Sequence, residues 1–480
     1  MSGLGSALEV ALMVQVLLWL SVILVFLVTG QGSIYHPLSI YLLFHGIVFV
    51  VRPLLVHYLN FDSQWHYMGF EPDERQQILA LVASSLALVV LASSMLSFGW
   101  CRTEFKSPEL RPYTREQKAA LLVVTLILTP LIAYSVNSFL SGGLQVERRN
   151  SMYVMVGASG YTIEAQYMAG PLICAWLAVK RFHWLAVLAV IPYIAYRAYC
   201  GTARWTIVLF FLVLVLVFAW YERLKWPSAW TVLCAIPIFL IFRAVGENRQ
   251  ILQNFLSGEE YRRPTTVLSG IEKWKAKYDG PDFANFDSLA FIMAVVPERT
   301  GTYTYGVQYL QLFTEPIPRK LWKGKPAGAP VRSFNLNNYA DFFGLTVSMV
   351  GDGWNSGGWV GIILMMTLVG AILGRAHRWF WWRGNSNMAP LFYLVGLAML
   401  PQWFRDGSIS IAKFLFWNWL PLGLWLAATW LLGPRRVPGY AVLLPGGATF
   451  HLLQTEAREP TVSHSAQADA LPSLSKPLPP

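Results

Sequence analysis

Apolar runs about 20 residues long recur along most of this chain, and such a run is long enough to cross a bilayer as a helix. Lipid offers no partner to free backbone groups, so helices are the expected form of these runs. Only 13% of the 480 residues are charged, whereas soluble domains carry about 25%. The sequence therefore predicts an all-α polytopic membrane protein.

The apolar runs predict about 11 transmembrane helices, with a range of roughly 10–12. The expected spans are Leu8–Val28, Pro37–Tyr58, Ile78–Phe98, Ala119–Val136, Tyr161–Val179, Phe182–Tyr199, Trp205–Tyr221, Trp230–Val245, Trp359–Leu373, Pro390–Trp403 and Ile411–Leu432.

Short connections rich in Lys and Arg mark the cytoplasmic side of a membrane protein. Most such connections here fall on one side if the N-terminus is outside and the C-terminus inside; examples are Cys101–Lys118, Lys180-Arg181 and Arg435-Arg436. This orientation places Gly246–Asn355 on the extracytoplasmic side.

Three regions follow from this pattern. Residues 1–433 form the helical bundle, and residues 246–355 form one large extracytoplasmic loop inserted in it. Residues 434–480 are rich in Pro, Ser and Ala and are expected to be a disordered cytoplasmic tail. This tail could be inert, or it could carry a proline-rich motif that binds a partner.

The formal net charge of +11 does not indicate a nucleic-acid partner, because membrane proteins collect Lys and Arg in their cytoplasmic loops. Four cysteines are scattered along the chain without a CxxC pair, so neither a disulfide framework nor a zinc site is indicated. The motifs of metalloproteases, nucleotide-binding loops and serine or cysteine elbows are missing as well. We expect no metal and no cofactor.

The most specific segment is Pro316-Ile-Pro-Arg-Lys-Leu-Trp-Lys-Gly-Lys-Pro326. Between Pro316 and Tyr339 the chain carries five cations and no acid. Prolines stiffen this segment, and Trp322 offers a stacking surface next to Lys325. Such a segment suits a diphosphate or a sugar, and an ordinary solvated loop is the equal alternative.

Several arginines are expected at the same outer face. Guanidinium groups clamp phosphate and stay charged at any relevant pH, although cations at helix ends also extend to lipid headgroups. Arg204 stands out, because an outer-face arginine runs against the charge bias of short loops. The set comprises Arg148, Arg149, Arg204, Arg243, Arg249, Arg299, Arg319 and Arg405.

Two polar residues precede the ninth expected span, in Ser348-Met-Val-Gly-Asp-Gly-Trp-Asn355. Asp352 and Asn355 could cap that helix, hold sugar hydroxyls or, for Asp352, accept a proton. Four further ionisable residues are expected within or near spans, where charge is expensive unless it is paired or functional. They are His45, Arg52, Glu164 and Arg197.

Together, the late external loop, Pro316–Pro326 and Ser348–Gly358 resemble the oligosaccharide repeat-unit polymerases (Wzy-type O-antigen polymerases). Gly201-Thr-Ala-Arg204 is similar to the small-residue and arginine entry to a mid-chain span in that family. The resemblance implies a membrane glycosyltransferase with a GT-C-like bundle in the bacterial inner membrane, and its active face would be extracytoplasmic. Its substrate would be undecaprenyl-diphosphate-linked oligosaccharide, and its product O-antigen, capsule or exopolysaccharide.

The resemblance also suggests roles for residues. Arg204 and Arg319 would stabilise the leaving diphosphate, and Asp352 would act as base. A chain-length co-polymerase and a flippase are the implied protein partners. The remaining residues expected to bind substrate are Arg148, Arg149, Trp322, Lys325, Asn355, Arg299 and Arg405.

Two rival functions stay open. An O-antigen ligase has a related layout and transfers the finished chain to a lipid A core. A transporter or flippase would move lipid-linked sugars without making a bond, and such proteins often show inverted repeats. We find no internal repeat, and the polar residues gather toward one face.

Overall fold

The computed structural model describes residues 6–59, 61, 65, 69–100, 112–140, 146–149, 152–155, 164–200, 204–228, 233, 283–314, 317, 321–322, 324, 336–339, 346–383, 387–433, 441–443 and 449–451. The chain forms two compact units, Met1–Leu431 and Leu432–Pro480. The predicted disordered tail lies almost wholly outside the described residues.

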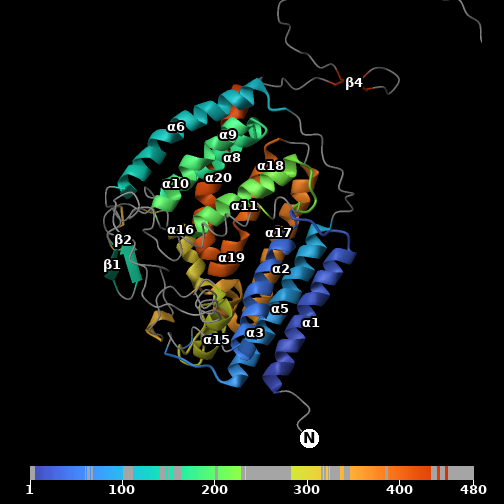
Figure 1. Cartoon of the computed structure of the whole chain (residues 1–480), viewed down its shortest axis with the longest axis vertical. Helices are drawn as coiled ribbons and strands as arrows, with labels where there is room; N and C mark the ends of the chain where they lie inside the picture. Colours follow the sequence, from blue (N-terminus) through green and yellow to red (C-terminus); the bar gives the residue numbers. More distant parts are fainter. Residues whose placement is uncertain are drawn as a thin grey trace, which may run out of the picture. The chain divides into compact units, whose positions relative to one another are not determined.

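The larger unit is a bundle of helices (Figure 1). Its elements are α1 (Ala7–Val28), α2 (Pro37–His45), the π-helix η1 (Gly46–Val51), α3 (Arg52–Leu59), α5 (Glu74–Gly99), α6 (Arg115–Leu140), η2 (Ala165–Met168), α8 (Ala169–Val179), α9 (Trp184–Leu188), α10 (Val190–Cys200), α11 (Arg204–Tyr221), α15 (Asn285–Val295), η4 (Val307–Leu310), α16 (Gln311–Thr314), η5 (Leu336–Asn338), α17 (Ser348–Trp382), α18 (Ala389–Ala398), α19 (Leu400–Asp406) and α20 (Ser408–Leu432).

Two short antiparallel hairpins accompany the helices. Strand β1 (Val146–Arg149) pairs with β2 (Met152–Met155), with Arg148 opposite Tyr153 and Arg149 opposite Met152. In the second unit, β3 (Ala441–Leu443) pairs with β4 (Thr449–His451).

Six helices among the described residues are long and apolar enough to cross a membrane. The predicted helical membrane class is thereby confirmed, and the predicted 11 spans are not reached within the described part. The region of α8 to α11 supplies shorter apolar helices, and the expected span Trp230–Val245 lies outside the described residues except for residue 233. The six are Ala7–Val28, Pro37–Leu59, Glu74–Gly99, Arg115–Ser138, Ser348–Trp382 and Phe414–Leu432.

Part of the predicted external loop is inside the bundle. All eleven residues of α15 are buried, and the helix packs against α17 and α5. Asp287 of α15 forms a buried ion pair with Arg52 at the start of α3, with 3.1 Å between Nη2 and Oδ2. Trp65 donates its indole N–H to the Asp287 carbonyl at 2.8 Å. These contacts fix α15 against the first helices of the chain.

Two contacts mark the opposite ends of the first helices. Leu8 at the start of α1 donates its N–H to Glu74 at the start of α5, and α15 lies toward this same end (Figure 1). At the other end, Ile34 donates its N–H to the carbonyl of Lys225. Arg223 belongs to this turn, and Arg383 follows the last residue of α17 at the same end.

Helix α17 is bent rather than straight. Its dihedral angles leave the helical region at Gly357 and Gly358, and Gly358 has φ +60°. A Cβ on Gly361 would collide with the carbonyl oxygen of Gly353, although residues eight apart in a straight helix are about 12 Å apart. The chain therefore reverses sharply here, and only glycine permits the close approach.

Beyond the bend, α17 packs closely on α5 through small residues. A Cβ on Gly374 would lie 2.8 Å from both the Gly99 nitrogen and the Met95 carbonyl oxygen. Ser94 donates its hydroxyl to the Thr367 carbonyl at 2.8 Å. Small residues that let backbones approach are typical of helix pairs in membranes.

This contact gives a stability prediction. Gly374→Ala should lower the free energy of unfolding by about 1–3 kcal/mol, because backbone atoms of α5 must move to admit the methyl group. Gly423→Ala in α20 is the matched control, since a Cβ there meets nothing within 4 Å. Thermal unfolding in detergent would measure both, and equal melting temperatures for the two variants would contradict the close packing.

Candidate functional site

Residues from four distant segments meet near the bend of α17, around Asp352. The carboxylate Oδ2 of Asp352 accepts the backbone N–H of Ser408, the first residue of α20, at 3.0 Å. Gly407 just before it has φ +84°, and a Cβ there would lie 2.6 Å from Oδ2. The start of a helix favours negative charge, so α20 stabilises the ionised carboxylate. Asp352 is 8% exposed.

A tyrosine faces this carboxylate from the predicted loop. Burial raises the pKa of Tyr309 in η4 well above its usual value, and the negative charge of Asp352 adds to that effect. The neighbouring Gln308 donates its amide to the Ser356 hydroxyl at 2.9 Å. Ser356 in turn donates to the Asp352 carbonyl at 2.8 Å. Tyr309 thus stays protonated beside Asp352.

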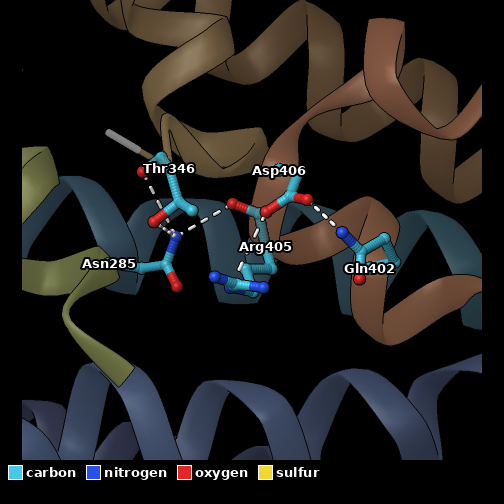
Figure 2. A network of polar contacts seen from close by, with 5 residues as sticks. All are labelled: Asn285, Thr346, Gln402, Arg405 and Asp406. Carbon is cyan, nitrogen blue, oxygen red and sulfur yellow. Dashed lines mark hydrogen bonds and ion pairs between the residues drawn. The ribbon is translucent and has the colours of Figure 1, made fainter. Parts of the chain in front are cut away.

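A second set of contacts joins α15, the entry to α17 and the end of α19 (Figure 2). Asn285 donates its amide to the Arg405 carbonyl at 2.9 Å and to the Thr346 hydroxyl at 3.1 Å. Gln402 donates to the Asp406 carboxylate, and Arg405 Nε lies 3.6 Å from Asp406 Oδ1. The Arg405 side chain is mostly buried, at 11% exposure.

We call Asn285, Thr346, Asp352, Arg405 and Asp406 the polar junction. Asp352 contacts Ser408, which is two residues after Asp406. The two sets of contacts therefore meet between the end of α19 and the start of α20. The junction brings a carboxylate and a guanidinium into the part of the bundle where α15 begins.

Four buried side-chain amide oxygens around the junction have no hydrogen-bond partner in the described part of the structure. They belong to Asn285, Gln308, Asn355 and Gln402. A buried amide acceptor without a donor costs about 1–3 kcal/mol, so native proteins rarely leave such groups unused. Each can accept a hydrogen bond from a hydroxyl group.

The structure gathers some of the predicted site residues and not others. Asp352 and Arg405 belong to the junction, and the carbonyl of Asn355 accepts both the N–H and the hydroxyl of Thr304. The side-chain oxygen of Asn355 has no hydrogen-bond partner among the described residues, so Asn355 does not cap α17. Asp352 caps α20 instead of its own helix. Arg299 is exposed, with its guanidinium 5.6 Å from the centroid of the Phe70 ring.

The structure describes the other predicted site residues less fully. Trp322 is half-buried. Arg148 and Arg149 are placed by their main chain in β1, and Arg204 by its main chain as the first residue of α11. Arg319 and Lys325 lie outside the described residues, as do Arg243 and Arg249.

The charged residues predicted within spans are engaged with neighbours. Arg52 pairs with Asp287, and His45 Nε2 lies 2.9 Å from the Gln15 amide nitrogen. Glu164 accepts the indole N–H of Trp417 at 3.2 Å. A buried charge of this kind can be explained by pairing or by function, and the ion pair with Asp287 explains Arg52.

Arg197 lies beside an apolar pocket. Its guanidinium donates to the Gln166 side-chain oxygen at 2.7 Å and lies 5.3 Å from the centroid of the Tyr167 ring. Tyr167 also lines a small, mostly apolar pocket, together with Tyr193, Phe210 and Phe414.

Sequence reasoning missed Asn285, Gln308 and Tyr309. All three lie within the predicted loop and reach the junction through tertiary packing. The one available signal was Asn285-Phe-Asp287, two polar residues at the start of a short apolar run.

No protein-family model, no curated protein and no solved structure matches the chain. Among the described residues, no group of three or more His, Cys, Asp or Glu side chains could hold a metal ion.

Proposed function

We propose that the protein is a membrane glycosyltransferase that polymerises undecaprenyl-diphosphate-linked oligosaccharide repeat units at the extracytoplasmic face of the bacterial inner membrane. The observation that carries this proposal is the buried carboxylate of Asp352. It lies in the Ser348–Gly358 segment of the polymerase resemblance and shares the polar junction with Arg405.

The chemistry needs a base and a stabilised leaving group. The Asp352 oxygen that does not accept the Ser408 N–H would take the proton of the acceptor hydroxyl. The acceptor oxygen would bond to the anomeric carbon of the donor sugar as the bond from that carbon to the diphosphate breaks. The diphosphate leaves with the bonding electrons and is stabilised by guanidinium groups. No nucleotide or oxidant is required.

The surroundings of the junction support a sugar substrate. The unpaired amide oxygens of Asn285, Asn355, Gln308 and Gln402 could accept hydrogen bonds from sugar hydroxyls.

Removing the gene tests the function directly. The cells should retain surface glycan that carries single repeat units, and long chains should vanish. A ligase would instead leave unattached long chains on the lipid carrier, and a flippase would leave lipid-linked units on the cytoplasmic side. Unchanged chain lengths would contradict the polymerase, and surface glycan unchanged in both amount and chain length would contradict all three functions.

The arginine assignments have their own test. Arg204→Ala and Arg319→Ala should each lower chain-lengthening by about 10²-fold or more, the effect of removing one donor to a developing charge. Immunoblots of membranes should show unchanged amounts of inserted protein. Arg383→Ala at the opposite end is the control and should retain activity. Full activity of both Arg204 and Arg319 variants would remove their proposed contact with diphosphate.

A further inference from the structure

Residues 301–310, which include η4, form a strap beside Asp352. Tyr309, near the end of the strap, places its buried hydroxyl next to the Asp352 carboxylate. The ten strap residues are all exposed or half-buried, whereas every residue of the preceding helix α15 is buried. Segments with few buried contacts open at a low free-energy cost, and the lids of active sites are of this kind. The strap is therefore a lightly held cover on an enclosed carboxylate.

Neutral hydrogen bonds join the strap to α17. Thr304 donates its N–H, at 2.7 Å, and its hydroxyl, at 3.0 Å, to the Asn355 carbonyl. Gln308 donates its side-chain amide to the Ser356 hydroxyl at 2.9 Å. Both acceptors follow Asp352 within four residues. A neutral hydrogen bond contributes only modestly to stability, so this attachment can break and form again while the bundle stays folded.

Glycines in the left-handed region lie at the start and in the middle of the strap. Gly301 has φ +69° and Gly306 has φ +77°. A Cβ on Gly301 would meet nothing within 4 Å, so the backbone conformation is what calls for glycine there. Just before Gly301, the Val296 carbonyl accepts the indole N–H of Trp354 at 2.8 Å, which fixes the end of α15 to α17. Gly301 thus separates a fixed point from a lightly held segment, as the hinge residue of a moving loop does.

We propose that the strap is a gate that turns about Gly301 and uncovers the Asp352 carboxylate. In the closed form Tyr309 stands where an acceptor hydroxyl would have to lie, and Asp352 is only 8% exposed. In the open form the carboxylate can meet the hydroxyl that it deprotonates. The control of glycosyl transfer by this gate rests on the proposed function, whereas the opening itself does not.

Carboxyl labelling of the native full-length protein tests the opening. A water-soluble carbodiimide with glycine ethyl ester converts accessible carboxyl groups to amides, and peptide mass spectrometry gives the rate for each one. Asp352 should be labelled more slowly than Glu298, which is exposed just before the strap. It should be labelled faster than Asp287, which is 0% exposed and ion-paired. An Asp352 rate as low as that of Asp287 would overturn the opening.

Releasing the strap should raise the labelling rate of Asp352. Thr304→Val removes one bond to α17 and should raise this rate about 2–10-fold, the effect of losing one net hydrogen bond. Gln308→Ala removes the bond to Ser356 and should give a rise of the same size, so it serves if the Thr304 variant fails to fold. Asp287 should keep its rate in both variants, because the gate opens without α15.

Thr302→Val is the matched control for Thr304→Val. The Thr302 hydroxyl donates to the carbonyl of the neighbouring Tyr303 at 3.0 Å, so its loss removes no bond to α17 and should leave the Asp352 rate unchanged. Equal Asp352 rates in the two threonine variants, or a parallel rise at Asp287, would overturn the gate.

A reversible lock connects the gate to catalysis. Gln308→Cys and Ser356→Cys, in a chain whose four native cysteines are replaced, would be joined by a short reagent that forms two reducible disulfides. The joined protein should lengthen chains about tenfold more slowly or less, and reduction should restore the rate. Full chain-lengthening by the joined protein would overturn the gate. A native protein that makes no chains would remove the polymerase function, and the labelling of Asp352 would still decide the gate.

Discussion

Asp287→Ala is expected to lower the free energy of unfolding by about 3–5 kcal/mol, because it leaves a buried charge without its partner. Arg52 and Asp287 are 2% and 0% exposed. Their ion pair is the polar link between α15 and the first helices, so its loss should also release α15. Thermal unfolding in detergent and protease accessibility of residues 283–300 would measure the two effects.

Two controls separate this buried pair from charge in general. His57→Ala removes a partly exposed contact to Glu9 and should change stability by less than about 1 kcal/mol. Arg52→Leu combined with Asp287→Leu should recover much of the loss, because apolar residues of similar size can replace a buried pair. A single Asp287 variant as stable as the His57 variant would show that the pair does not anchor α15.

The long spans could be predicted from sequence because their signal is local. The expected span Ile78–Phe98 lies within α5, and the expected span Leu8–Val28 lies within α1. The apolar runs of both helices are long enough to cross a bilayer. Helix α15 could not be recognised in this way. Its eleven residues are too few to span a bilayer, and burial on all sides comes from packing against α17 and α5.

The polar junction was predictable only in part. Asp352 and Arg405 were suggested by their place in the expected topology, but their meeting depends on the bend at Gly357-Gly358 and on the left-handed Gly407. Tyr309 and Asn285 join them through contacts between segments distant in sequence. Arg299 was suggested by the same topology and lies on the surface against Phe70.

Asp352→Asn is the most informative single change, because it separates two roles of the carboxylate. The asparagine amide oxygen can still accept the Ser408 N–H, so the start of α20 keeps its cap. The amide cannot accept the proton of a sugar hydroxyl. If Asp352 is the base, chain-lengthening should fall about 10²–10⁴-fold, the usual contribution of general base catalysis.

Structural and chemical roles also differ in their other readouts. The Asp352→Asn protein should melt at nearly the same temperature as the native protein. By contrast, Gly407→Ala should destabilise it, because the new Cβ would meet Asp352 Oδ2 at 2.6 Å and the φ of +84° disfavours alanine. Asp352→Ala, which removes cap and base together, should show both the activity loss and a lower melting temperature.

The most direct measurement is the length of glycan made by purified protein in vesicles supplied with undecaprenyl-diphosphate-linked repeat units. The native protein is expected to produce a ladder of chains, and folded Asp352→Asn protein is expected to leave the repeat units single. A full ladder from the Asp352→Asn protein, or no ladder from the native protein, would contradict glycosyl transfer at the polar junction.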